Sequence, residues 1–291
     1  MTTTPLQTVR YAAGKLSLLL ALTAAFGVGA SLAGSTPAHA ERRDAKDDTT
    51  YTIKRIYKTG DTDRYRLTSK INMDSPAGGG PIDVTTLMLM KDTTKEAKED
   101  GTLTSISEFE SAAVTFNGMD LDITTMMPKV ITTRDKNGKS DFKMEGGNEQ
   151  VTSQIGDQLK QFSMASAAAL LPPKPVKVGD SWDMAPDSSG PKDQKITGKV
   201  TLVSVDTVKG VKVAKLKTVS DVTTGTDTKI HTEATTLVDI ATGKPLSATT
   251  KTAGSSNGSP INIEMTLKMV GPDDKDGAKE AVKTDSAAKK P

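Results

Sequence analysis

The sequence predicts a mainly β protein, in which antiparallel meanders form a curved sheet or half-barrel covered by one amphipathic helix. Three observations lead to this expectation. Apolar and polar side chains alternate along many segments, as they do in strands with one buried face. Short turns containing glycine join these segments, which favours antiparallel neighbours. A single segment has the three- and four-residue apolar spacing of a helix face.

The first forty residues have the character of an export signal. Arg10 and Lys15 provide a positive start, residues 16–34 are apolar, and the predicted cleavage lies between Ala40 and Glu41. An uncleaved membrane anchor is the alternative, because the apolar stretch approaches the length of a bilayer span. We expect cleavage, since glycines and a small-x-small site suit a signal peptidase better than a stable span. The mature protein would then be periplasmic or extracellular, with no stable membrane span.

Charge and cysteine content restrict the classes of function. Removing Arg10 and Lys15 from the 38 basic residues leaves 36, which equals the 36 acidic residues. No basic excess remains to attract nucleic acid, so we expect no nucleic-acid partner. The chain has no cysteine, which excludes disulfides, thiolate metal sites, thiol nucleophiles and a lipid-modified cysteine.

A single β-rich domain is expected over residues 51–270, after a disordered charged stretch at 41–50. The first meander begins with strands at 51–57 and 65–73, joined by the turn "TGDTD". It continues through strands 82–90 and 103–116 and a hairpin over 131–145.

The predicted helix covers residues 149–171 and separates the two halves of the domain. Val151, Ile155, Leu159 and Phe162 lie on one helical face, and Pro172-Pro173 ends the helix.

A second meander follows the helix. It is expected to contain strands at 195–208, 211–219, 229–240, 244–252 and 261–269. From residue 271 to 291 the chain has almost nothing to bury, so this tail is expected to be disordered. Each meander follows a Gly-Asp pair, Gly60-Asp61 or Gly179-Asp180, and this suggests two repeats, 51–147 and 174–270.

Ser181 and His231 are the candidates for serine hydrolase chemistry. Gly179-Asp180-Ser181 resembles the nucleophile block of the GDS-type lipases and esterases, and His231 is the one histidine outside the signal. In those enzymes an aspartate lies three residues before the histidine, where this chain has Thr228. A turn that leads Trp182 into a strand is the favoured interpretation.

Other polar and sulfur-containing pairs are better explained by packing or solvation. His231 and Glu233 are too few ligands for a metal site. Met88 and Met90 suit a core better than a soft-metal site, and Glu108 and Glu110 suit a solvated strand face better than a glycosidase cleft. We therefore expect no catalytic residue, metal or cofactor, and a protein that is not an enzyme.

Three stretches resemble a family of exported bacterial proteins of unknown function. They are "LPPKPVKVGDSW" (171–182), "YKTGDTDRYRL" (57–67) and "VDIATGKPLSAT" (238–249). The resemblance implies a signal sequence, a β-rich body and a structural role for the Gly-Asp-Ser-Trp block. It implies no activity, since none is established for the family.

The layout is also similar to envelope lipid and lipoprotein carriers with an open half-barrel. This similarity suggests an apolar cleft between sheet and helix, which would bind a lipid or an envelope protein. The cleft would be lined by Leu67, Ile71, Met73, Ile263, Met265 and Leu267. A cell-surface structural or interaction protein without a ligand is the alternative, and a hydrolase using Ser181 is the third hypothesis.

Overall fold

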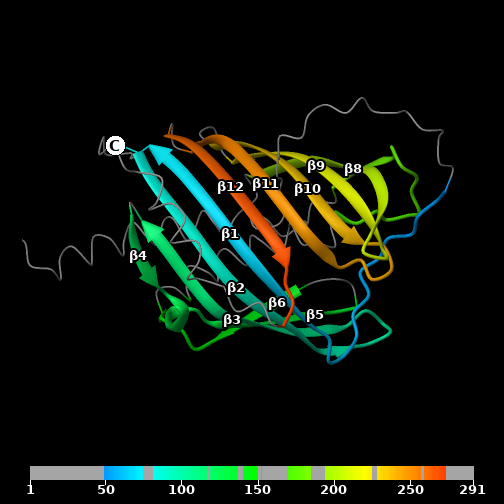
Figure 1. Ribbon diagram of the computed structural model, residues 1–291, viewed down its shortest axis with the longest axis horizontal. Coiled ribbons are helices and arrows are strands. Elements are labelled where there is room, and N and C mark those ends of the chain that lie inside the picture. Colours follow the sequence, from blue (N-terminus) through cyan, green and yellow to red (C-terminus); the bar gives the residue numbers. More distant parts are fainter. Residues whose placement is uncertain are drawn as a thin grey trace, which may run out of the picture.

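The computed structural model describes residues 49–74, 81–116, 118–136, 140–149, 152, 170–184, 194–224, 228–256 and 259–272. These residues form one open antiparallel sheet and a short 3₁₀ turn, so the mainly β prediction is confirmed (Figure 1). The predicted helix over 149–171 lies outside the described residues except at four positions near its ends. The predicted cleavage site at Ala40 and Glu41 and the chain after residue 272 also lie outside them.

The sheet contains twelve strands. The first half of the chain supplies β1 (Thr62–Asp74), β2 (Pro81–Ala97), β3 (Leu103–Phe116), β4 (Met119–Asp122), the turn η1 (Thr124–Met126), β5 (Lys129–Arg134) and β6 (Ser140–Glu145). The second half supplies β7 (Ser181–Asp183), β8 (Gln194–Val208), β9 (Val211–Thr224), β10 (Thr228–Asp239), β11 (Pro245–Ser256) and β12 (Ser259–Met269).

The first and last strands meet at the centre of the sheet. The strand order is β6-β5-β3-β2-β1-β12-β11-β10-β9-β8-β7, with β4 paired to β3. Leu67 of β1 pairs with Leu267 of β12, and Ile71 pairs with Ile263. The cyan β1 and the orange-red β12 run side by side in Figure 1. Two local meanders therefore combine into one sheet through a single long-range pairing.

Each meander begins with a Gly-Asp turn of the same geometry. Gly60 has a φ of 88° and Gly179 a φ of 93°, values that an L side chain rarely adopts. The Gly60 N–H donates to the Thr94 carbonyl, and the Gly179 N–H donates to the Leu202 carbonyl, both at 2.8 Å.

The strand that receives each turn is bulged at the same place. The backbone amides of Thr94 and Leu202 donate in return to the backbone carbonyls of Asp61 and Asp180, at 2.9 and 3.0 Å. The strand register then shifts immediately after Thr94 and immediately after Leu202. The two turns thus share their hydrogen bonds and the following bulge, while the proposed duplication of the whole domain stays a prediction.

The hydrophobic core lies on one face of the sheet, which we call the inner face. One apolar cluster on this face involves β1, β2, β3 and β12, and includes Ile71, Val84 and Ile263. A second cluster involves β7, β8, β9 and β10 and includes Trp182, Leu202 and Leu216. Strand alternation places these side chains on the inner face because paired residues across a ladder point the same way.

Residues 51–57, which we call the crossing segment, do not form the predicted strand. Tyr51 makes one isolated antiparallel bridge to Val176, and Ile53 is buried in the second cluster. The Ile56 amide donates to the Thr242 carbonyl at 2.8 Å. The alternating pattern correctly indicates alternating burial along 51–57, but the segment packs over the second cluster instead of joining the sheet.

Candidate functional site

The six predicted cleft residues lie together on the inner face of the two central strands. The register pairs Leu67 with Leu267 and Ile71 with Ile263. Met73 and Met265 lie on the same face, opposite Ile261 and Ser69. Ile71, Met73, Ile263 and Met265 are buried, whereas Leu67 and Leu267 are partly buried. Their contact with a ligand stays a prediction.

Ser181 and His231 are not brought together. Two strands separate β7 from β10, so at the usual strand spacing the two residues are at least about 14 Å apart. A nucleophile and its base must reach hydrogen-bond distance. The Ser181 hydroxyl instead contacts Thr201 Oγ1 at 2.7 Å, and His231 Nδ1 contacts Asp221 Oδ1 at 2.8 Å. The structure gives the serine hydrolase hypothesis no geometric support.

The other candidate pairs have packing or ion-pair partners. Glu108 contacts Lys129 at 2.9 Å, and Arg64 Nε donates to Glu110 at 2.9 Å. Met88 is buried in the first cluster and Met90 packs against it. In the part of the chain that the structure describes, no group of three or more His, Cys, Asp or Glu side chains could hold a metal ion.

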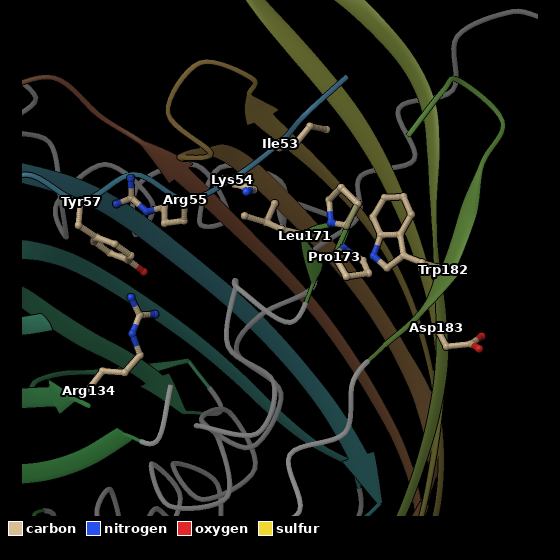
Figure 2. Close-up of a pocket in the computed structure, with 10 residues that line it drawn as sticks. Ile53, Lys54, Arg55, Tyr57, Arg134, Leu171, Pro173, Trp182 and Asp183 are labelled. Atoms are coloured by element: carbon tan, nitrogen blue, oxygen red, sulfur yellow. The ribbon is translucent and has the colours of Figure 1, made fainter. Parts of the chain in front are cut away.

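A pocket of about 350 Å³ lies beside the crossing segment, between residues from both edges of the sheet (Figure 2). Trp182 and Asp183 come from edge strand β7, and Arg134 comes from β5, next to the opposite edge strand β6. The pocket is completed by Ile53, Lys54, Arg55, Tyr57, Leu171, Pro172 and Pro173. Residues near opposite edges can line one pocket only if the sheet is strongly curved.

The two ends of the pocket differ in chemistry. Leu171, Pro173 and Trp182 form an apolar end, whereas Arg55, Tyr57 and Arg134 gather at the other end (Figure 2). The Tyr57 ring lies between two guanidinium groups, with Arg55 Cζ 4.6 Å and Arg134 Cζ 4.9 Å from its centroid. Such contacts are favourable cation–π interactions, but they bring two positive charges to one ring.

Trp182 carries an unpaired donor at the apolar end. The residue is 9% exposed, and within the described part of the chain its Nε1 has no hydrogen-bond partner. Buried indole N–H groups normally have one, because leaving a buried donor unpaired is costly. The Gly179-Asp180 turn places Trp182 here, with Val200 opposite it in the β7–β8 ladder.

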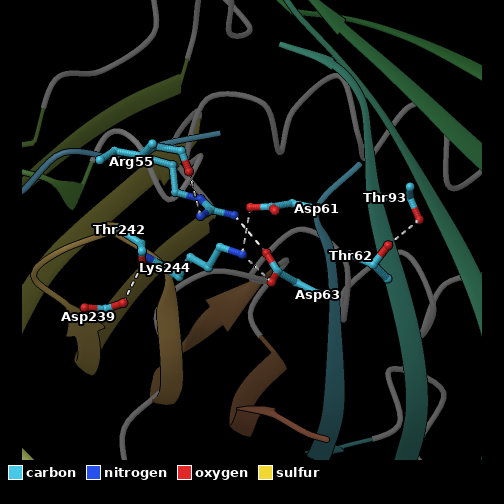
Figure 3. Close-up of polar contacts among 9 residues, drawn as sticks. Arg55, Asp61, Thr62, Asp63, Thr93, Asp239, Thr242 and Lys244 are labelled. Carbon is cyan, nitrogen blue, oxygen red and sulfur yellow. Dashed lines mark hydrogen bonds and ion pairs between the residues drawn. The ribbon is translucent and has the colours of Figure 1, made fainter. Parts of the chain in front are cut away.

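Ion pairs fix the crossing segment beside the pocket (Figure 3). Arg55 contacts Asp63 at 3.1 Å, and Lys244 contacts Asp63 at 2.7 Å and Asp61 at 3.2 Å. Partial burial disfavours the charged form of Lys244, but its hydrogen bonds to Asp63 and Asp61 outweigh this and raise the pKa of Lys244. The network therefore ties residue 55 to the start of β1 and to the β10–β11 turn.

A second acid lies opposite Asp63 in the β1–β2 ladder. This acid is Asp92, the direct ladder partner of Asp63. Burial is the largest cause that raises the pKa of Asp92, and the charge of Asp63 raises it further. A hydrogen bond from Ser107 has the opposite, lowering effect. Burial and the Asp63 charge also raise the pKa of the neighbouring Tyr65. This end of the inner face is thus polar and anionic beneath the crossing segment.

Unpaired hydroxyl groups lie on the inner face between the two apolar clusters. Thr218 of β9, Thr236 of β10 and Thr250 of β11 are 4%, 4% and 1% exposed, and none of these hydroxyls has a hydrogen-bond partner among the described residues. Ser69 of β1 is 1% exposed and is also unpaired. Most buried hydroxyl groups in proteins are hydrogen-bonded, so a group of four marks this band as unusual.

Sequence reasoning did not identify the basic end of the pocket. It singled out Trp182 but assigned it to packing, and it gave no role to Tyr57 or Arg134. These residues come from segments far apart in the chain, so their meeting depends on a curvature that no local pattern encodes. The prolines at 172 and 173, beside Trp182, were the available local signal.

Comparisons with known proteins give limited similarity. No protein-family model and no curated protein matches the chain. Lipovitellin, solved in a study of its lipid–protein interactions, has a TM-score of 0.48 at 10% identity; the match covers 74% of this chain but 26% of that chain.

Two bacterial structures are also similar. A putative exported protein with a YmcC-like fold from Bacteroides fragilis matches at a TM-score of 0.24 and 11% identity, covering 77% of this chain and all of that one (100%). A putative outer membrane lipoprotein-sorting protein domain from Vibrio parahaemolyticus matches at a TM-score of 0.16 and 10% identity. The match covers 75% of this chain and 91% of that chain. Similarities of this size do not establish a shared fold or function.

Proposed function

We propose that the protein is an exported, non-enzymatic carrier that binds an amphipathic apolar ligand, such as a lipid, on the inner face of a half-barrel-like sheet. In the part of the chain that the structure describes, no helix has the length and apolar character needed to span a bilayer. The proposal rests on the inner face itself, since the similarities to known structures are too weak to support it.

The unpaired hydroxyl groups carry the proposal. Thr218 lies beside Ala234, Ala234 beside Thr250, and Thr250 beside Met265, which in turn lies opposite Ser69. This row of small and hydroxyl-bearing side chains crosses the inner face between two clusters of larger apolar residues. A buried hydroxyl without a partner costs about 1–3 kcal/mol. A ligand with acyl chains and ester or amide oxygens would satisfy both the hydroxyls and the apolar clusters.

The curvature of the sheet also supports a carrier. Arg134 and Trp182 lie near opposite edges of the sheet yet line one pocket. A curved open sheet gives a concave apolar surface, the kind of surface on which small apolar ligands bind. The six central residues Leu67, Ile71, Met73, Ile263, Met265 and Leu267 lie midway between the two edges and are proposed to contact the ligand's apolar part.

Native mass spectrometry after expression of the full chain in its host tests the proposal. We expect a stoichiometric adduct that organic extraction identifies as a lipid. The double variant Thr218→Val/Thr250→Val should retain less of it at unchanged fold, because valine removes the hydroxyls and keeps the shape. Thr235→Val, in which the altered side chain points away from the inner face on β10, is the matched control.

A clean unliganded mass, with no uptake of added phospholipids or fatty acids, would contradict the carrier proposal. This result would favour a cell-surface interaction role, which the exposed apolar residues of β4 also support. Met119 and Leu121 of β4 are 59% and 43% exposed, so this strand has apolar side chains accessible at the surface.

A further inference from the structure

Among the described residues, one guanidinium group of the pocket in Figure 2 has no carboxylate partner. Arg55 is paired with Asp63 at 3.1 Å (Figure 3). The Arg134 guanidinium contacts the Tyr57 ring, and no carboxylate of the described residues pairs with it. Arg134 is only partly exposed. A partly buried guanidinium without a carboxylate partner favours an anion nearby.

The remaining charges in the pocket do not compensate Arg134. Lys54 adds a further positive group to the lining. Asp183 also lines the pocket, but Figure 2 shows its carboxylate directed away from the basic end. The basic end therefore keeps an excess of positive charge, and it faces an apolar wall formed by Leu171, Pro173 and Trp182.

The apolar end provides an independent sign of a ligand. Trp182 lines the pocket and is more than nine-tenths buried, and its Nε1–H has no hydrogen-bond partner among the described residues. An acceptor that the described residues do not supply would satisfy this donor. A molecule with an anionic group at one end and an ester or amide carbonyl further along would match both ends of the pocket.

We propose that this pocket binds the phosphate or carboxylate group of an anionic amphiphile, with Arg134 as its cationic partner and the Trp182 indole N–H as donor to a carbonyl of the same molecule. The proposal rests on the proposed carrier function and narrows its ligand to anionic lipids. It also separates two tasks, since the inner face would select apolar chains and the pocket would select the charged group. The planar guanidinium of Arg134 suits multidentate recognition of phosphate or carboxylate.

Binding of two short-chain lipids that differ in head-group charge tests the proposal. Dihexanoyl phosphatidic acid, dihexanoyl phosphatidylcholine and inorganic phosphate are titrated into the full chain by calorimetry, below the micelle concentration of each lipid. Trp182 is the one tryptophan of the chain, so its fluorescence reports on this pocket. We expect the phosphatidic acid to bind at least tenfold tighter than the phosphatidylcholine and to change the Trp182 emission.

Substitution of Arg134 assigns the effect to the pocket. Arg134→Gln should weaken phosphatidic acid binding about tenfold and phosphatidylcholine binding less than twofold. Lys136→Gln removes a nearby exposed charge outside the pocket and should change neither by more than twofold. If the glutamine variant does not fold, Arg134→Lys replaces it in the test. This variant keeps the charge but loses the planar group, so it should bind phosphatidic acid more weakly than the original protein, by less than tenfold.

The outcomes separate this inference from the carrier proposal. Equal binding of the two lipids, or no effect of Arg134→Gln, would overturn the inference and leave the carrier proposal standing. If inorganic phosphate binds as tightly as phosphatidic acid, the pocket is a site for free anions, and the proposal that its ligand is an amphiphile is contradicted. Arg134-dependent phosphate binding without binding of either lipid would support the anion site and contradict the carrier.

Discussion

The Gly-Asp turns at residues 60 and 179 share a backbone but lead to different chemistry. In both turns the hydroxyl after the aspartate faces a threonine of the next strand, Thr62 with Thr93 and Ser181 with Thr201. The next residue is Asp63 in the first meander and Trp182 in the second.

The residue at this position decides what each turn does. Asp63 binds Arg55 and Lys244 and so holds the crossing segment, whereas Trp182 forms the wall of a pocket. Their ladder partners differ in the same way, because Asp92 lies opposite Asp63 and Val200 lies opposite Trp182. The same backbone turn can thus support an ion-pair anchor or a pocket wall, depending on one side chain.

The largest expected effect is on the second turn. Trp182→Ala removes a buried indole from the second cluster and should lower the free energy of unfolding by about 3–5 kcal/mol. Urea unfolding followed by circular dichroism measures it, since the variant has no tryptophan. Trp182→Phe should lose clearly less. A loss below about 1 kcal/mol for the alanine variant would show that the second turn does not organise the core.

The corresponding change at the first turn should cost less. Asp63→Asn leaves Arg55 and Lys244 without their shared carboxylate and should destabilise the protein by about 2 kcal/mol. A double-mutant cycle with Lys244→Gln should give a favourable coupling energy between the two residues, measured by urea unfolding. Additive effects would mean that the ion pair does not hold the crossing segment.

The glycine that the two turns share should be equally important for stability in both turns. Gly60 and Gly179 have similar positive φ values, and an added Cβ would meet no atom within 4 Å at either position. Gly60→Ala and Gly179→Ala should therefore each cost about 1–2 kcal/mol from the backbone alone. Gly243→Ala is the contrasting variant, because its Cβ would lie 2.4 Å from the Lys54 carbonyl oxygen, and its loss in thermal or urea unfolding should be larger.

The smallest expected effect concerns Asp92. Because its pKa is raised in the folded protein, its contribution to stability is complete below the unfolded pKa and is lost as the pH rises through the folded pKa. Asp92→Asn should therefore be slightly more stable than the original protein at neutral pH, by under about 1 kcal/mol. The difference should shrink as the pH is lowered. An unchanged difference between pH 4 and pH 7 would contradict this assignment.

The sequence predicted strands better than it predicted their partners. Alternation over 261–269 and the Lys209-Gly210 turn located β12 and the β8–β9 hairpin, since both signals are local. The same alternation over 51–57 indicated burial correctly but could not show that its hydrogen bonds go to Val176 and Thr242. The four residues of β4 alternate apolar and polar side chains, yet all four are exposed, so alternation does not indicate a buried face there.

The candidate site was less predictable than the fold. The central residues such as Ile71 and Ile263 were found because each belongs to a regular strand. The pocket was missed because no local pattern links Arg134, Tyr57 and Trp182, which come from segments far apart in the chain. Their meeting requires the curvature of the whole sheet, which depends on long-range packing.

The pairing of β1 with β12 also has a consequence for the timing of folding. Tyr65 pairs with Met269, so the central seam of the sheet joins residues from opposite ends of the domain. Closing so long a loop is entropically costly and slows folding. Neither half can complete the sheet until the last strand is available. A chain exported from its N-terminus onward would therefore lack the central seam of the sheet until its final strand has been made.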